Sequence, residues 1–286
     1  MYKGFSSGLL GFGGRTLEED VPLAVKYGYG GIFVDVAREA GTDPGHANTE
    51  GAKELLEKNG LKAGGFSLPV NFRESGEAFD ADMKMLPARC GFARGIGADR
   101  CITWLIPASD TLDYKTNYEL HKKRLGEAAK VLEDNGIRFG LEFVGPPSER
   151  RGKKYEFIHN LDGIMELMGD IGTSNLGILM DVWHWDLAGQ TYADFKKISG
   201  NRQIVLVHIN DAPKGIPAGE QRDLVRELPG ATGVLKIADF MRGLIDLAYD
   251  GPVYVEPFYA PFKTMAFEDA LKAAKAAMDS VWPKNA

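Results

Sequence analysis

The sequence predicts a single (β/α)8 TIM barrel, an α/β fold, as one domain over residues 1–286. Apolar strand-like runs alternate with helical patterns along the chain, and the runs number eight. A chain of 286 residues also suits one barrel, which commonly needs about 250 residues. The hydrophobic fraction of 44% and the charged fraction of 26% supply material for a large core and argue against disorder.

Short apolar or β-branched runs are the predicted strands. Several follow a glycine where a left-handed helix cap is common, as in KYGYGGIFVDV and DNGIRFGLEFVG. The runs GIFVDV and GILMDV are apolar almost throughout, as parallel strands covered on both faces should be. In chain order, the segments that carry the strands are 2–10, 26–36, 58–68, 95–107, 134–145, 170–182, 202–211 and 251–259.

Helical patterns fill the intervals between these segments, and some begin with capping residues such as Thr16 and Asn160. A doubly wound open sheet would show the same alternation, but GLLGFGGR lacks the glycine spacing of a dinucleotide-binding loop. The strand count therefore favours the closed barrel. The predicted helices are 15–28, 48–59, 75–96, 114–135, 160–171, 191–199, 234–248 and 265–280.

Charge and composition exclude several classes of protein. A net charge of −6 offers no basic stripe for phosphates, so we expect no nucleic-acid partner. Cys90 and Cys101 are too few for a disulfide framework and lack metal-site spacing, so both are predicted to be buried small hydrophobes. Neither a signal peptide nor an apolar run of membrane-spanning length is visible, which predicts a cytoplasmic protein without a membrane partner.

Two long irregular stretches follow predicted strands. They are 144–157 and 210–233, and both lie after strand C-termini, where barrel enzymes keep their sites. The first holds a basic run of Arg150, Arg151, Lys153 and Lys154. This run could meet a phosphate or carboxylate of a substrate, but a solvated charge run or a subunit contact is the favoured interpretation.

Four strands end in polar residues where the pattern expects apolar ones: Glu142, Asp181, His208 and Glu256. Taken alone, each could cap a helix or pair with a neighbour. On four neighbouring strands of a barrel, however, the side chains could converge on one point. Three buried carboxylates need compensation, and carboxylates with one imidazole suit a divalent cation such as Mn²⁺, Mg²⁺, Co²⁺ or Zn²⁺.

The segments LEFVGP, MDVWH, HINDAP and VYVEPF resemble the strand ends of the xylose isomerase-like superfamily, which includes ketose 3-epimerases and inosose isomerases and dehydratases. This resemblance implies that Glu142, Asp181, His208 and Glu256 hold one metal ion. It also implies that His184, three residues after the aspartate, reaches the substrate or braces a ligand. The histidine-rich, multi-zinc pattern of the related endonuclease IV branch is not met by five histidines.

The sequence departs from the resembling family after His208. Many members have a basic residue just before the aspartate of the H-x-x-D segment, where this chain has Asn210 before Asp211. Ketose epimerases place a substrate-binding arginine soon after the histidine. Here the candidates, Arg222 and Arg226, come later in an enlarged loop, so the identity of the substrate cannot be carried over.

The predicted function is a metal-dependent isomerase or epimerase that acts on a sugar, keto-sugar or cyclitol through an enediolate, with Glu142 and Glu256 moving the proton. A dehydratase or lyase on a keto-sugar or cyclitol is the alternative, and a non-catalytic carbohydrate-binding barrel is less favoured. A homo-dimer or homo-tetramer is expected by resemblance. Aromatic residues near strand ends are candidate substrate contacts: Phe66, Trp104, Trp183 and Phe258.

Overall fold

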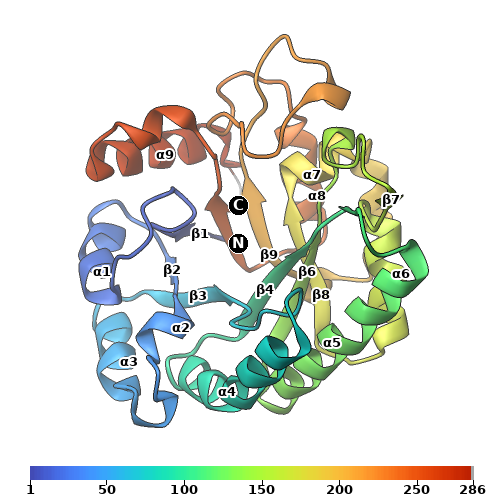
Figure 1. The fold of residues 1–286 in the computed structure, drawn as a ribbon. Coiled ribbons are helices and arrows are strands. Elements are labelled where there is room, and N and C mark those ends of the chain that lie inside the picture. Colours follow the sequence, from blue (N-terminus) through green and yellow to red (C-terminus); the bar gives the residue numbers. More distant parts are fainter. Residues whose placement is uncertain (285–286) are drawn as a thin grey trace.

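Eight parallel strands close into a barrel, with helices around it (Figure 1). The computed structural model describes residues 1–284. The closed barrel confirms the predicted fold class and excludes the open sheet. In order around the barrel, the strands are β1 (Tyr2–Phe5), β10 (Pro252–Val255), β9 (Ile204–Ile209), β8 (Leu176–Asp181), β6 (Arg138–Phe143), β4 (Arg100–Leu105), β3 (Lys62–Ser67) and β2 (Gly31–Phe33).

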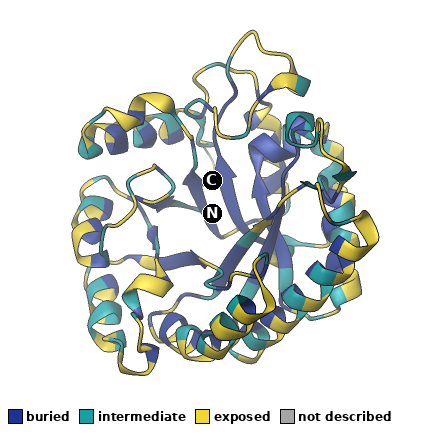
Figure 2. Cartoon of the chain, viewed as in Figure 1, coloured by how far each residue is buried: buried dark blue, intermediate teal, exposed yellow. Residues whose placement is uncertain are grey.

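The helices bury one face against the strands and expose the other, as Figure 2 shows. Predicted caps are confirmed at two of them. The Thr16 side chain accepts from the amide of Glu19, and that of Asn160 accepts from the amide of Gly163. The principal helices are α1 (Leu17–Lys26), α3 (Thr49–Lys58), α4 (Gly76–Gly95), α5 (Tyr114–Asp134), α6 (Leu161–Ile171), α8 (Ile237–Asp246) and α9 (Phe267–Val281).

Short elements differ from the sequence-based expectation. The predicted helix 191–199 is only a 3-10 helix, η3 (Tyr192–Lys197), and α7 (Val182–Leu187) was not predicted. Asp181 explains α7, because its carboxylate ends β8 and accepts from the amide of Trp183 at 2.7 Å. The other short elements are α2 (Val36–Glu39), β5 (Ala108–Ser109), which pairs with β7 (Tyr155–Glu156), η1 (Pro44–His46), η2 (Pro147–Glu149), η4 (Asn201–Gln203), η5 (Ala218–Glu220) and η6 (Ala260–Lys263).

A small cluster of side chains fills the interior of the barrel. Ile102, Leu179, Val205, Leu206 and Tyr254 form a cluster separate from the larger one between strands and helices. The Tyr254 ring lies against two glycines across the barrel. A Cβ on Gly4 would overlap its ring carbons, and a Cβ on Gly64 would overlap its hydroxyl oxygen. These glycines are therefore required by close approach of a neighbouring side chain.

Both cysteines are free and buried, as predicted. Burial raises the pKa of the Cys90 thiol to about 12, so it stays protonated and unreactive at neutral pH. No helix within residues 1–284 combines the length and apolar character that crossing a membrane requires.

The contact between Gly64 and Tyr254 predicts a specific mutational coupling. We expect Gly64→Ala to destabilise the protein by about 1–3 kcal/mol, because the added methyl overlaps the buried hydroxyl. Tyr254→Phe removes that oxygen, which has no hydrogen-bond partner among the described residues, and should relieve most of the loss. Urea unfolding of both single variants and the double variant measures the coupling.

Gly4→Ala is the matched control, because its methyl meets ring carbons that phenylalanine retains. Its cost should be similar in the wild-type chain and in the Tyr254→Phe variant. An equal cost of Gly64→Ala in both of these backgrounds would contradict this account of the barrel interior.

Candidate active site

The four polar strand ends converge at the carboxyl ends of β6, β8, β9 and β10. Asp181 lies opposite His208 in the register of β8 and β9. His208 Nδ1 is 3.4 Å from Glu256 Oε2 and 4.0 Å from Asp181 Oδ2. Glu142 completes the group, and one of its oxygens lies within 4.8 Å of ligand atoms on Asp181 and His184. The structure thus brings together all four residues predicted to bind a metal.

A register shift aims His208 into this group. β9 pairs with β8 through Ile178–Ile204 and then Leu179–Leu206, so one extra residue of β9 is accommodated there. Val205 and Leu206 consequently both contribute to the barrel interior. Strict alternation from Val205 would have pointed Val207 inward, whereas alternation from Leu206 points His208 inward.

The donor set fits a divalent cation. Both ring nitrogens of His208 and the Oε1 atom of Glu142 are buried and have no hydrogen-bond partner among residues 1–284. Buried polar atoms without partners are rare, because each costs about 1–3 kcal/mol. Carboxylate oxygens and one imidazole nitrogen are ligands for Mg²⁺, Mn²⁺, Co²⁺ or Zn²⁺. A cation bound among these residues would satisfy atoms that the protein leaves unpaired.

The electrostatics of the two glutamates are opposite. Burial, together with the charges of Asp181 and Glu256, raises the pKa of Glu142 well above its usual range. Burial also opposes ionisation of Glu256, but His208 and Arg226 outweigh it and lower the pKa of this carboxyl to about 2. Positively charged side chains of the protein therefore stabilise the ionised form of Glu256, whereas they do not offset the cost of ionising Glu142.

Arg226 supplies that positive charge. Its Nη1 donates to Asp181 Oδ2 at 2.7 Å and to Glu256 Oε2 at 3.1 Å. Its Nη2 donates to Asp223 Oδ1 at 2.6 Å and lies 3.2 Å from His184 Nε2. Burial alone would lower the pKa of Arg226, but these carboxylates raise it, so the guanidinium stays charged. Arg226 is thus a fixed cation beside the predicted metal ligands.

Asp211 positions the loop that carries Arg226. Its buried carboxylate accepts four backbone amides, and its backbone exchanges two hydrogen bonds with Glu227 at 2.8 and 2.9 Å. Glu227 directly follows Arg226, so this pairing fixes the arginine's place. The sequence revealed Asp211 in an H-x-x-D segment but gave no sign of this role. The amides belong to Ala212, Thr232, Gly233 and Leu235.

The predicted substrate contacts separate into three groups. Arg226 and His184 lie in the site, whereas Arg222 is exposed and no hydrogen bond or ion pair of its side chain is found in residues 1–284. Phe66 is 0% exposed and packs between the strands and the helices, so it does not line the site. Trp104, at 47% exposure, does reach the open end of the barrel.

Two further aromatic candidates contact Arg226. The fully buried Trp183 ring and the half-exposed Phe258 ring have centroids 5.2 and 4.8 Å from the guanidinium carbon. Phe258 adopts a left-handed conformation with φ of 36°, which is strained for a bulky residue. Both rings, which the sequence predicts as substrate contacts, therefore lie against the Arg226 guanidinium.

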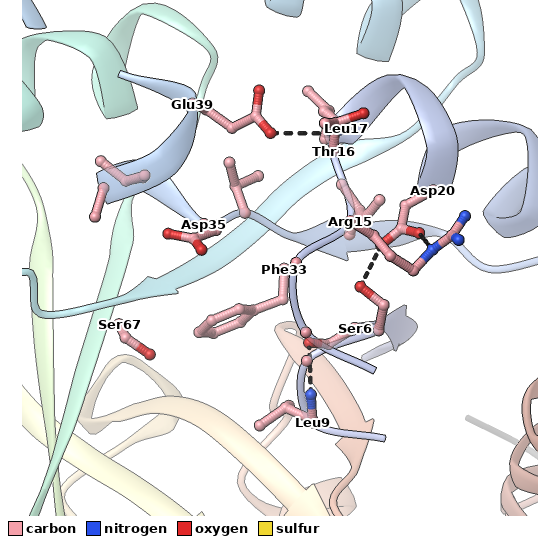
Figure 3. Close-up of a pocket in the computed structure, with 18 of the residues that line it drawn as sticks. Ser6, Leu9, Arg15, Thr16, Leu17, Asp20, Phe33, Asp35, Glu39 and Ser67 are labelled. Atoms are coloured by element: carbon pink, nitrogen blue, oxygen red, sulfur yellow. Dashed lines mark hydrogen bonds and ion pairs between the residues drawn. The ribbon is translucent and has the colours of Figure 1, made fainter. Parts of the chain in front are cut away.

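A cavity of about 370 Å³, lined by both apolar and polar residues, occupies the opposite half of the barrel mouth. Ser6 and Asp35, which follow β1 and β2, and Ser67, which ends β3, line it and surround the open space in Figure 3. At its edge, Asp20 accepts from Ser7 and Arg15, both at 2.5 Å. Sequence reasoning missed this half, although its polar residues also stand at or just after strand ends.

Curated relatives match part of this chain. An inosose isomerase from Halalkalibacterium halodurans is 27% identical over 154 residues, which are 53% of this chain and 50% of that protein, so the chain spans about half the length of the curated relatives it matches.

Among solved structures, a xylose isomerase domain protein from Alicyclobacillus acidocaldarius has a TM-score of 0.84 at 25% identity, over 98% of this chain and 97% of the other. The IOLI protein with a bound zinc atom has a TM-score of 0.79 at 18% identity, over 98% of each chain. The family model for the xylose isomerase-like TIM barrel matches residues 21–282. The chain therefore belongs to the xylose isomerase-like TIM barrel family.

Proposed function

We propose that this protein is a divalent-metal-dependent isomerase or epimerase of a small sugar, keto-sugar or cyclitol. The observation that carries the proposal is the convergence of Glu142, Asp181, His208 and Glu256 from four neighbouring strands, with buried ligand atoms left unpaired. The similarity to an inosose isomerase supports the substrate class and reaction. The zinc atom in the IOLI protein, which has the same fold, supports the metal requirement.

The positions of the two glutamates suit proton transfer. β6 and β10 are the outer strands of the group β6-β8-β9-β10, so Glu142 and Glu256 flank the space above Asp181 and His208. In this proposal one glutamate removes a proton from the carbon beside a carbonyl, and the other returns a proton from the opposite side. A divalent cation bound by these residues would polarise the carbonyl and stabilise the negative charge that develops on it.

Arg226 and His184 complete the proposed site from the chain's own groups. The guanidinium lies within hydrogen-bond distance of Asp181 and Glu256, and His184 lies 4.0 Å from Glu142 Oε1. His184 can hold a substrate oxygen near the carboxylates, while Arg226 fixes the positions of Asp181 and Glu256. In the cavity on the other half of the mouth, Ser6, Asp35 and Ser67 offer hydrogen-bonding groups to the remaining hydroxyls of a polyol.

Metal binding is the first expected outcome. Purified protein loaded with Mn²⁺ or Zn²⁺ should retain about one ion per chain after dialysis, measured by elemental analysis. Asp181→Asn and His208→Ala should each weaken binding by about 100-fold, because the first removes the ligand's negative charge and the second removes the imidazole. The control His46→Ala changes an exposed histidine and should bind as wild type does. Equal binding by all three variants would place the metal elsewhere.

Proton transfer is tested by deuterium uptake. In D₂O, wild-type protein with a panel of ketoses and inososes should introduce deuterium beside a carbonyl, detected by NMR. Glu142→Gln and Glu256→Gln should each slow this uptake by about 100-fold or more, because each removes a proton carrier. Exposed Glu50 provides the control variant Glu50→Gln.

The products and the metal content make this test decisive. An isomer or epimer supports the proposal, whereas loss of water would identify the dehydratase or lyase. Full exchange by either glutamine variant, at unchanged metal content, would refute the assigned proton carriers.

Arg226 is expected to compete with a metal ion for the same carboxylate oxygens. Because the guanidinium donates to Asp181 Oδ2 and Glu256 Oε2, Arg226→Met should tighten binding of Mn²⁺ by about tenfold while slowing deuterium uptake. Arg151→Met is the matched control, because that side chain donates to the Gly219 carbonyl and not to these carboxylates. Calorimetry measures the affinity. Weaker binding in Arg226→Met than in the control would show that the arginine supports the ligands.

A further inference from the structure

Arg73 is a stacked cation for which residues 1–284 supply no acceptor. It lies in the loop between β3 and α4, and its guanidinium carbon is 4.1 Å from the ring centroid of Phe72 and 4.0 Å from that of Trp104. The Nε and Nη2 atoms are buried and have no hydrogen-bond partner in the part of the chain that the structure describes. Within residues 1–284, no carboxylate lies within ion-pair distance of this guanidinium, and no other arginine has two such nitrogens.

The basic run that the sequence suggested for anion binding is different. Arg150 donates to the carbonyls of Gly145 and Pro146, Arg151 donates to that of Gly219, and Lys153 pairs with Asp110 at 2.7 Å. These cations hold loops in place. Arg73, in contrast, has its guanidinium shielded by rings and its pKa lowered to about 10 by burial. A desolvated cation of this kind is unfavourable until it meets an anion.

Arg73 lies beside the proposed reaction site. Trp104 on β4 stands directly opposite Glu142 on β6 in the strand register, and neighbouring strands are about 4.8 Å apart. β4 and β6 run side by side at the open barrel end in Figure 1. The half-exposed Trp104 ring therefore has Arg73 at its face and Glu142 on the adjacent strand. Trp104 thus links the Arg73 guanidinium to the strand that carries Glu142.

We propose that Arg73, held between Phe72 and Trp104, binds an oxyanion of the substrate, a carboxylate or a phosphate, several bonds from the reacting carbons. This proposal rests on the proposed function and narrows its substrate class to sugar acids or sugar phosphates. A guanidinium offers paired N–H donors that match both groups, and the rings strengthen the interaction by excluding water. The Trp104 ring provides an apolar surface for the carbons between the anion and the carbonyl.

Three ligands that differ at one carbon test the proposal: fructose, fructuronate and fructose 6-phosphate. Binding to the metal-loaded protein is followed by tryptophan fluorescence, because Trp104 lies against the guanidinium. Wild type should bind at least one of the two anions about tenfold more tightly than fructose. The carboxylate and phosphate arms then distinguish the two sources of the oxyanion.

The variants separate anion recognition from folding and from catalysis. Arg73→Gln should abolish the preference for the anion and leave fructose binding within twofold, whereas Arg73→Lys should keep part of it. Arg94→Gln, an exposed arginine at the end of α4, is the matched control. The melting temperature of Arg73→Gln should not fall, because a buried cation without an ion-pair partner is removed.

The outcomes are distinct for the two proposals. Equal binding of all three ligands by wild type, or an unchanged anion preference in Arg73→Gln, would overturn the anion site and leave the metal-dependent isomerase in place. Failure of wild type to bind a divalent ion or to exchange solvent deuterium would instead overturn the proposed function. Anion-selective fluorescence that depends on Arg73 would still support the oxyanion site in that case.

Discussion

Three carboxylates gathered at one end of a dry barrel form the constraint on which the rest of the site depends. Glu142, Asp181 and Glu256 lie at strand ends where the preceding residues are apolar and buried, so water compensates their charges poorly. One buried cation, Arg226, pairs with two of these carboxylates. The three carboxylates and Arg226 together still have a net negative charge, even before Asp223 is counted. A dication offsets this negative charge and also gives one of the unpaired ring nitrogens of His208 a partner.

Precise placement of these charges comes from features outside the ligands. The extra residue in β9 turns His208 inward, and the backbone pairing of Asp211 with Glu227 brings Arg226 over the carboxylates. Phe258 accepts a strained backbone conformation, and its ring lies against the guanidinium. Each feature gives up some local regularity or backbone freedom to hold one side chain. The loop after β9 is long, and it returns to the mouth of the barrel to place Arg226 there.

Sequence reasoning predicted the parts of the molecule that local patterns encode. Alternating apolar runs and glycine-marked helix ends gave the barrel, and polar residues at apolar strand ends gave Glu142, Asp181, His208 and Glu256. The partners of those residues were harder to predict. Whether Arg222 or Arg226 enters the site depends on how a loop of more than twenty residues folds back, which no local pattern specifies.

The same limit applies to the aromatic residues, because a phenylalanine near a strand end can face the helices, as Phe66 does, or the mouth, as Phe258 does. The side of a strand that a residue faces depends on register, and a bulge changes it. In the structure Trp104 faces the mouth, since it lies two residues beyond the inward-facing Ile102. The proposed role of Arg73 rests on the absence of a hydrogen-bond acceptor among residues 1–284, which only the folded structure reveals.

The two arginines of the barrel mouth differ in a way that bears on orientation of a substrate. Arg226 donates to three carboxylates and has little capacity left, so it acts mainly on its neighbours' charges. Arg73 has none of these partners and keeps its full charge for a ligand. The mouth thus joins an acidic region on β6, β8 and β10 to a cationic position beside β4. A molecule with a carbonyl at one end and an oxyanion at the other matches this polarity in one direction only, because the reversed molecule would bring its anion to the carboxylates.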